Sequence, residues 1–203
     1  MSTAYHALFV ESLASRLRAW QAEGKLDLDD LDRSLSPRAR AWVEGSCEAA
    51  ATPAEDVETL VALAAEQFGG EAALAELAGG IAPAWQERVP FADLLRAARS
   101  LVDGPGFVVS QAAELLVVAP DWSFSGSREH FSVRLEGVAS ASPALKSYLG
   151  ALLARLASAA AGASCEVHVE GLDQGALCVS GRRDPDRIDR SGDAVRLARA
   201  ALA

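Results

Sequence analysis

Hydrophobic positions in the first half of the chain recur with the period of an α-helix. Residues three or four positions apart lie on one face of a helix, so these faces are expected to pack against a core. The residues that form them are Phe9, Leu13, Leu17, Trp20, Val57, Leu60, Val61, Ala64, Phe68, Phe91, Leu94, Leu95, Ala98, Leu101 and Val102. Gly24 and Gly69 are expected to end two of the helices, because glycine readily adopts the left-handed conformation found there.

Other helices are predicted from the residues that begin or end them. Ser36 and Pro37 precede a helix, and proline is well tolerated in a first helical turn. Residues 52–55, Thr-Pro-Ala-Glu, match a capping box, in which the Thr and Glu side chains bind backbone amides. A further short helix is expected to stop at Gly79 and Gly80.

The pattern changes after a turn predicted at residues 104–106, Gly-Pro-Gly. Residues 107–110 and 114–118 are short runs rich in β-branched side chains, which predicts strand, with a bulge near Gln111. Residues 120–127 contain the Pro, Gly and Ser of a turn region. Between residues 130 and 136, Phe131, Val133 and Leu135 alternate with polar residues, which is typical of a half-buried antiparallel strand.

A long helix and a hairpin are predicted next. Ser142 and Pro143 begin the helix and Gly162 ends it. Its inward-facing residues are Leu145, Tyr148, Leu149, Leu152, Leu153 and Leu156. Residues 165–170 alternate as a strand, and residues 177–180 return as its hairpin partner. The order of elements after residue 106 is therefore strand, strand, helix, strand, strand.

These elements predict an α+β fold in which an N-terminal helical layer packs on an antiparallel sheet. We expect one domain over residues 1–181, helical in 1–103 and sheet-containing in 104–181. The next segment, residues 182–193, has eight charges in twelve positions, which indicates a solvated linker. A short C-terminal helix is expected to follow, so that linker and helix together occupy residues 182–203.

Composition and charge narrow the range of partners. The chain has 203 residues, of which 50% are hydrophobic, so a single large domain with a core is expected. A net charge of −9 disfavours nucleic acid and anionic membrane surfaces. The one candidate membrane span, residues 144–163, contains Lys146 and Arg155, so we predict a buried helix and no membrane insertion.

The first residues and the cysteines of the chain indicate the cellular compartment in which the protein is expected. The first residues lack the basic start and unbroken apolar run of a secretory signal, so a cytoplasmic location is expected. Cys47, Cys165 and Cys178 are scattered and odd in number, which favours free thiols in a reducing cytoplasm. A disulfide between Cys165 and Cys178 stays open as the alternative, since both lie on strands expected to be neighbours.

Five segments of the chain form a recognisable layout: residues 65–70 (AEQFGG), 91–102, 104–109, 132–138 (SVRLEGV) and 142–153 (SPALKSYLGALL). In this layout, residues 5–181 resemble a paralogous protein family that is abundant in myxobacteria. That family is similar in layout to haem nitric-oxide-binding domains, vinyl-reductase-type domains and related trafficking-complex subunits. The resemblance implies a helical layer on an antiparallel sheet with an apolar cavity between them, and it implies no particular activity.

A haem function can be tested on the residues. A haem sensor needs a histidine that faces an apolar pocket from a helix, because the iron takes an axial imidazole. His6 lies at the start of the first helix, and His130 and His168 fall on the polar phase of strands. The haem sensors also use a Tyr-x-Ser-x-Arg motif, where this chain has Phe124 and Gly126. We therefore predict no haem and no other cofactor.

Other candidate chemistry has a simpler alternative in each case. The sequence contains no nucleophile elbow, P-loop, HExxH or dinucleotide-binding motif. His168, between Glu166 and Glu170, is a candidate general base, but a water-exposed hairpin face is favoured. The acidic residues 27–32 are a candidate cation site, but an acidic helix start is favoured because the glycine bend and terminal glutamate are missing. No metal site is therefore predicted.

The function predicted is a non-enzymatic binding module, a sensor or scaffold. Its partner is expected to be a protein, a second copy in a homodimer, or a small apolar ligand in a cleft between the layers. The predicted ligand-binding residues are Trp122, Phe124 and Tyr148. Two alternatives stay open: an enzyme with a dispersed polar site, and a purely structural assembly subunit. The residues that favour the enzyme are His130, Arg134 and Glu136.

Overall fold

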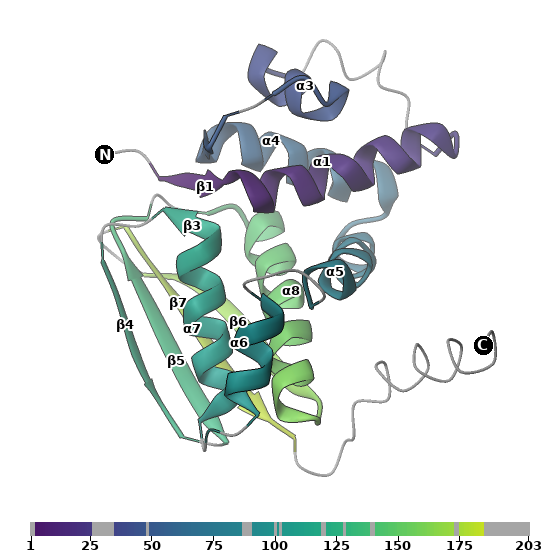
Figure 1. Ribbon diagram of the computed structural model, residues 1–203. Helices are drawn as coiled ribbons and strands as arrows, with labels where there is room; N and C mark the ends of the chain where they lie inside the picture. The colour runs from purple at the N-terminus through teal and green to yellow at the C-terminus, as the bar shows by residue number, and fades with distance from the viewer. Residues whose placement is uncertain are drawn as a thin grey trace, which may run out of the picture.

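The computed structural model describes residues 3–25, 35–47, 49–86, 91–99, 101, 103–118, 121–127, 129–138, 141–172 and 175–184. Its helices and strands form an α+β fold, as predicted (Figure 1). The helices are α1 (Ala7–Ala22), α3 (Pro37–Glu44), α4 (Ala54–Phe68), α5 (Glu71–Gln86), α6 (Phe91–Ala98), α7 (Gly104–Leu116) and α8 (Pro143–Ala161). The strands are β1 (Ala4–His6), β2 (Ala51–Pro53), β3 (Val117–Val118), β4 (Asp121–Gly126), β5 (His130–Glu136), β6 (Cys165–Leu172) and β7 (Ala176–Arg183).

The strands form two antiparallel sheets. The smaller sheet has the order β2-β1-β3 and joins segments that are far apart in the sequence. The larger sheet has the order β4-β5-β7-β6, so β4 and β6 are its edge strands. Helices α7 and α8 pack on one face of the larger sheet, and α4 and α5 pack in turn against α8 (Figure 1).

Strand β5 shows how the sheet separates core from solvent. Phe131, Val133 and Leu135 are buried beneath the helices, while His130 and Arg134 are exposed on the opposite face. The predicted alternation is therefore confirmed. On the neighbouring strand β7, residues 177 and 179 are also buried, so the helix-facing side of the sheet is apolar across its two central strands.

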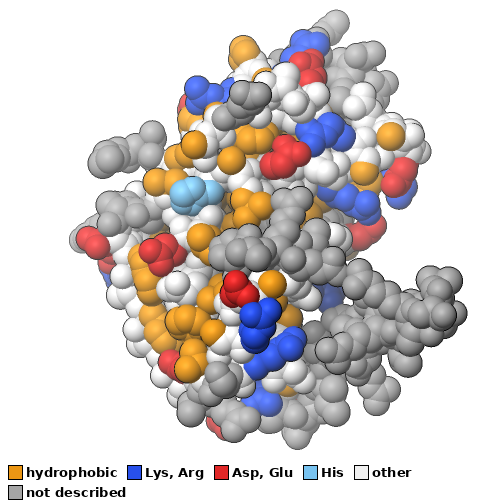
Figure 2. Space-filling model, in the orientation of Figure 1, with side chains coloured by type: hydrophobic (Ala, Val, Ile, Leu, Met, Phe, Trp, Pro, Cys, Tyr) orange, Lys and Arg blue, Asp and Glu red, His pale blue; other side chains and the backbone are white. Residues whose placement is uncertain are grey.

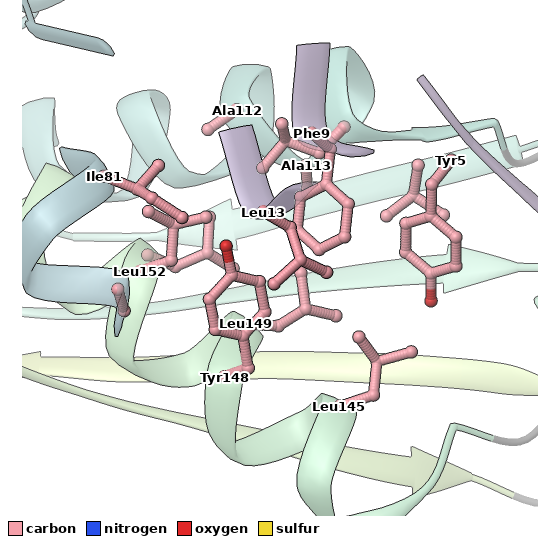
Figure 3. Close-up of a cluster of buried hydrophobic side chains, with 14 of the residues drawn as sticks. Tyr5, Phe9, Leu13, Ile81, Ala112, Ala113, Leu145, Tyr148, Leu149 and Leu152 are labelled. Atoms are coloured by element: carbon pink, nitrogen blue, oxygen red, sulfur yellow. The ribbon is translucent and has the colours of Figure 1, made fainter. Parts of the chain in front are cut away.

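Helix α8 is the central element of the core. The Ser142 hydroxyl caps its N-terminus by accepting a hydrogen bond of 3.1 Å from the Leu145 amide, and Gly162 ends it in the left-handed conformation. The predicted inward-facing residues of α8 are all buried. Figure 3 shows Tyr148 of α8 beside Phe9 and Leu13 of α1. The ring centroids of Tyr148 and Phe9 lie 5.5 Å apart in an edge-to-face arrangement, which ties α1 to α8.

The strand prediction for residues 107–110 and 114–116 is wrong, because these residues belong to helix α7. The helix is buried on most sides, so its sequence lacks the polar face that would reveal a helical period. Pro105 lies in its first turn, where a missing amide hydrogen costs little. Gly104 permits close packing, since a Cβ there would lie 2.1 Å from the Ala98 carbonyl oxygen. Only Val117 and Val118 of this region form a strand.

The turn predicted over residues 120–127 is also wrong in part, because residues 121–126 form strand β4. Trp122 and Phe124 supply the aromatic residues that strands favour, and they alternate with exposed serines. The order β4, β5, α8, β6 and β7 agrees only loosely with the predicted strand, strand, helix, strand, strand, because its first strand lies at residues 121–126 and not at 107–118, and helix α7 and strand β3 precede it.

Two other local predictions are corrected by packing. Helix α5 does not stop at Gly79 and Gly80 but continues to Gln86. A Cβ on Gly79 would lie 3.7 Å from the Arg155 guanidinium, an ordinary van der Waals contact, so a side chain of α8 lies beside α5 at this point. Thr52 does not cap α4; it lies in β2 and accepts a hydrogen bond of 2.7 Å from the Trp42 indole.

The predicted linker begins later than expected. Strand β7 extends to Arg183, and Arg182 pairs with His130 on β5 and Glu166 on β6. Residues 185–203, with the predicted C-terminal helix, and the acidic residues 27–32 lie outside the described residues. The thiols of Cys165 and Cys178 are free, and the two residues are not cross-strand partners, which removes the geometric basis for the alternative disulfide.

Candidate functional site

A hollow of about 320 Å³ opens where the small sheet meets the first strand of the larger sheet. It is lined from five elements, namely β1, α7, β3, β4 and β5. The lining residues are His6, Glu114, Val117, Val118, Asp121, Trp122 and Leu135. Val118 is 42% exposed and is one of two large hydrophobic residues that the described chain leaves open to solvent. The hollow is therefore reachable from outside.

The chain builds this hollow by changing direction twice. Helix α7 ends at Leu116, and the next two residues form β3, where Val117 pairs with Tyr5 of β1. The chain then enters the larger sheet at Asp121. Trp122 pairs with Leu135 on β5, so both side chains face the helix-covered side of the sheet. Because α7 ends near this corner, it does not cover Trp122 fully, and the indole stays half-buried.

The hollow has an apolar part and an acidic rim. Val117 and Leu135 are buried, whereas Glu114 and Asp121 are exposed. The lining residues include two acids, one histidine and one tryptophan, and no Lys or Arg. Carboxylates bind cations through charge-assisted hydrogen bonds, and the face of an indole attracts a cation through its quadrupole. The arrangement therefore suits a ligand with an apolar part and a positive charge.

Two edge strands border the hollow, and each has one side without a partner among the described strands. Strand β3 is an edge of the small sheet, and β4 is an edge of the larger sheet. Figure 1 shows β4 at the margin of the larger sheet, and among the described strands it pairs only with β5. An edge strand presents unpaired backbone N–H and C=O groups to its surroundings. Figure 2 shows hydrophobic side chains gathered over α7 and the neighbouring part of the sheet.

The structure separates the three predicted ligand-binding residues. Trp122 lines the hollow. Phe124 is half-buried and packs against α7, where its ring atom Cε2 lies 2.7 Å from the position that a Cβ of Gly106 would occupy. Tyr148 is 0% exposed in the core, and burial raises the pKa of its hydroxyl well above the usual range. Of the three, only Trp122 lines the hollow.

The other lining residues were missed by sequence reasoning. His6 is the last residue of β1, and Glu114 lies in the last turn of a helix that was predicted as strand. Their proximity depends on the pairing of β1 with β3, which no local sequence pattern predicts. Of these residues, Asp121 had a local signal in the sequence, because it directly precedes Trp122, a predicted ligand-binding residue.

The residues that favoured an enzyme face water. His130 is exposed on β5, and the side chains of Arg134 and Glu136 are 47% and 44% exposed and form an ion pair with each other. His168 and its neighbour Glu166 are also exposed on β6, as the favoured interpretation of this hairpin predicted. These groups do not line the hollow.

The described residues form neither a metal-binding cluster nor a membrane-spanning helix. Within the ranges that the structure describes, no cluster of three or more His, Cys, Asp or Glu side chains could hold a metal ion. No described helix combines the length and the apolar character needed to span a membrane. A comparison of the chain with protein-family models, curated proteins and solved structures found no match. The resemblance in layout to the myxobacterial family therefore stays a prediction.

Proposed function

We propose that this protein is a binding module for a protein partner, and that the partner docks at the hollow around Trp122. The observation that carries the proposal is the half-buried indole of Trp122 in a hollow of about 320 Å³ beside two free strand edges. Tryptophan is enriched among the residues that dominate binding energy at protein interfaces. A half-exposed indole offers a large apolar surface that a partner can cover.

A protein partner fits the hollow better than a small apolar ligand does. The rim carries the exposed carboxylates of Glu114 and Asp121, which an apolar ligand would desolvate without replacing their hydrogen bonds. Between the layers, the region around Tyr148 and Phe9 is filled by packed side chains, as Figure 3 shows. The three free thiols agree with a reducing cytoplasm as the place of action.

The proposal is tested by selecting an unbiased library of twelve-residue peptides on the full chain. Peptides enriched on the wild type are expected to bind the Trp122→Ala variant at least about tenfold more weakly, because truncation of an anchor commonly costs that much. Ser123→Ala is the matched control, since Ser123 is the next residue of β4 and faces the opposite side of the sheet.

The outcome depends on where the enriched peptides bind. Equal binding to the wild type and the control, with loss in Trp122→Ala, supports the hollow as the docking site. Enriched peptides that bind Trp122→Ala as well as they bind the wild type would contradict it. Thermal unfolding of each variant is measured in parallel, so that a loss of binding is compared only between folded proteins.

A further inference from the structure

The free edge of β4 and the charge of the hollow together indicate what kind of segment the partner contributes. We infer that the partner adds an extended strand to the outer edge of β4 and places a Lys or Arg side chain of that strand in the hollow. The inference rests on the proposed binding function, and it adds the conformation and the chemistry of the ligand.

The two edges of the larger sheet differ in how they are protected. Natural edge strands avoid unwanted pairing by carrying charged residues, prolines or bulges. Strand β6 alternates Glu166, His168 and Glu170 along its exposed positions. After Asp121, the exposed positions of strand β4 are Ser123, Ser125 and Gly126, and its six residues include no Lys, Arg or Pro. Strand β4 is therefore the edge that is left open to a further strand.

The register of the sheet places the partner's side chains. In an antiparallel or parallel pair, residues opposite each other point to the same face. A residue opposite Trp122 on an added strand would therefore point to the helix-covered side, as Trp122 and its partner Leu135 do. That is the side on which the hollow opens beside Trp122 and Leu135. Alternate residues of the added strand would face the water-exposed side, next to Ser123 and Ser125.

Charge complementarity selects a basic side chain for the position opposite Trp122. Two of the seven lining residues are exposed acids: Glu114 on α7, the helix on the side that Trp122 faces, and Asp121 at the start of β4, which shares the phase of Ser123 in the strand alternation. The chain as a whole carries a net charge of −9. The stem of a Lys or Arg covers apolar surface while its head reaches carboxylates. A long basic side chain can therefore contact the indole and the valines with its methylene groups and Glu114 with its charge. A second copy of this chain would bring the same negative charge, so it suits the edge less well.

The inference is tested with strand-forming heptapeptides of the sequence Thr-Val-Thr-X-Thr-Val-Thr, acetylated and amidated, in which only the central residue X differs. Calorimetric titration of the full chain is expected to show the Lys peptide binding about tenfold more tightly than the norleucine peptide, which has the same stem without the charge. The Glu peptide is expected to bind still more weakly. A single acetylated and amidated lysine is expected to bind at least about tenfold more weakly than the heptapeptide, because it offers no backbone to β4.

A change in the protein and a change in the peptide test separately the role of the charge and the role of the backbone pairing. In the Glu114→Gln, Asp121→Asn double variant, the preference for Lys over norleucine is expected to vanish, while the affinity for the norleucine peptide stays unchanged. Methylation of the peptide nitrogens along one edge of the Lys peptide is expected to abolish binding, whereas methylation along the other edge is tolerated. Tolerance of both would overturn the strand pairing.

The remaining outcomes keep this inference apart from the proposed function. Equal affinity for the Lys, norleucine and Glu peptides, or no binding of any heptapeptide, would overturn the inference. Library peptides that depend on Trp122 would still support a binding module in that case. A dimer in light scattering that Trp122→Ala dissociates would assign the edge to a second copy and would overturn the basic strand as its occupant.

Discussion

The two faces of the larger sheet differ in how tightly they are packed. Beneath α7 and α8, Phe131, Val133 and Leu135 are at most 5% exposed. On the opposite face of the same strand, the side chains of Arg134 and Glu136 are 47% and 44% exposed. Apolar burial contributes roughly 25 cal/mol for each Å² removed from water, so the helix-facing side dominates the stability of the sheet.

The hollow lies where the tightly packed face ends. Trp122 points to the same side as the buried residues of β5, but α7 ends before it covers the indole completely. The comparison shows that a polar pattern on a strand was a poor guide to a site, since His130 and Arg134 only face water. Trp122, which was predicted in a turn region, lies on the apolar phase of the edge strand β4 and lines the hollow.

The largest loss of stability is expected at Gly181, in the packed part of the larger sheet, where an added atom has no space. A Cβ on Gly181 would lie 2.1 Å from ring atom Cζ of its cross-strand partner Phe131. Gly106 lies close to the Cβ end of the same side chain, so the ring has little room to move away. Gly181→Ala should therefore lower the free energy of unfolding by about 2–3 kcal/mol, as overpacking of a core does. Urea unfolding followed by circular dichroism measures this loss.

Gly171→Ala is the control, because Gly171 is a strand glycine of the same sheet whose Cβ would meet only the Lys146 ammonium, at 3.7 Å. It should change the stability by less than about 0.5 kcal/mol. Combining Gly181→Ala with Phe131→Leu should restore part of the loss, because the shorter side chain vacates the space. Equal losses at Gly181 and Gly171 would show that the close packing around Phe131 is not the cause.

Sequence reasoning succeeded where the pattern of side chains reflects a single buried face. The alternation of β5 and the leucine face of α8, with Ser142 and Gly162 as its caps, could be predicted because each element meets the core on one side. Sequence reasoning failed at α7, which is surrounded by other elements. A helix that is apolar on most sides shows no helical period of hydrophobic and polar residues in its sequence.

The candidate site was predictable only in part, for a related reason. Trp122 was identified because a large aromatic residue in a segment rich in turn residues stands out locally. His6 and Glu114 reach the hollow through the pairing of β1 with β3, which links residues more than a hundred positions apart. Such long-range pairing is specified by the packing of the whole core, and a local window of sequence does not contain it.

An intermediate effect on stability is expected at Tyr148, whose hydroxyl is a polar group among the apolar residues of α8's inward face. Its hydroxyl is buried and makes no hydrogen bond within the described structure. Burial raises the pKa of Tyr148, so the folded protein keeps the proton at a pH where the unfolded chain, with a pKa of about 10, releases it. The contribution of this neutral hydroxyl is therefore fully present below pH 10 and is lost as the pH rises further.

The Tyr148→Phe variant removes this titration. It should be at least as stable as the wild type at pH 7, because no hydrogen bond is lost. At pH 11 it should be more stable than the wild type by about 1.4 kcal/mol beyond the difference at pH 7, which is the free energy of one pH unit. Tyr5→Phe is the companion variant, since burial and the nearby Glu58 raise the pKa of Tyr5 in the same direction. A loss of more than about 1 kcal/mol at pH 7 in Tyr148→Phe would reveal a hidden hydrogen-bond partner.

The smallest effect on stability is expected from a substitution on the water-facing side of the larger sheet. Arg134 pairs with Glu136 two residues further along β5, and both side chains are close to half exposed. Exposed ion pairs are screened by water and must hold two long side chains in one geometry, so they add little stability. Arg134→Ala should therefore change the free energy of unfolding by less than about 0.5 kcal/mol in urea titrations at low salt. It should also leave peptide binding at the hollow unchanged, because Arg134 lies on the opposite face from Trp122. A loss above 1 kcal/mol would mean that this face is covered in solution, and the contrast between the two faces of the sheet would then be wrong.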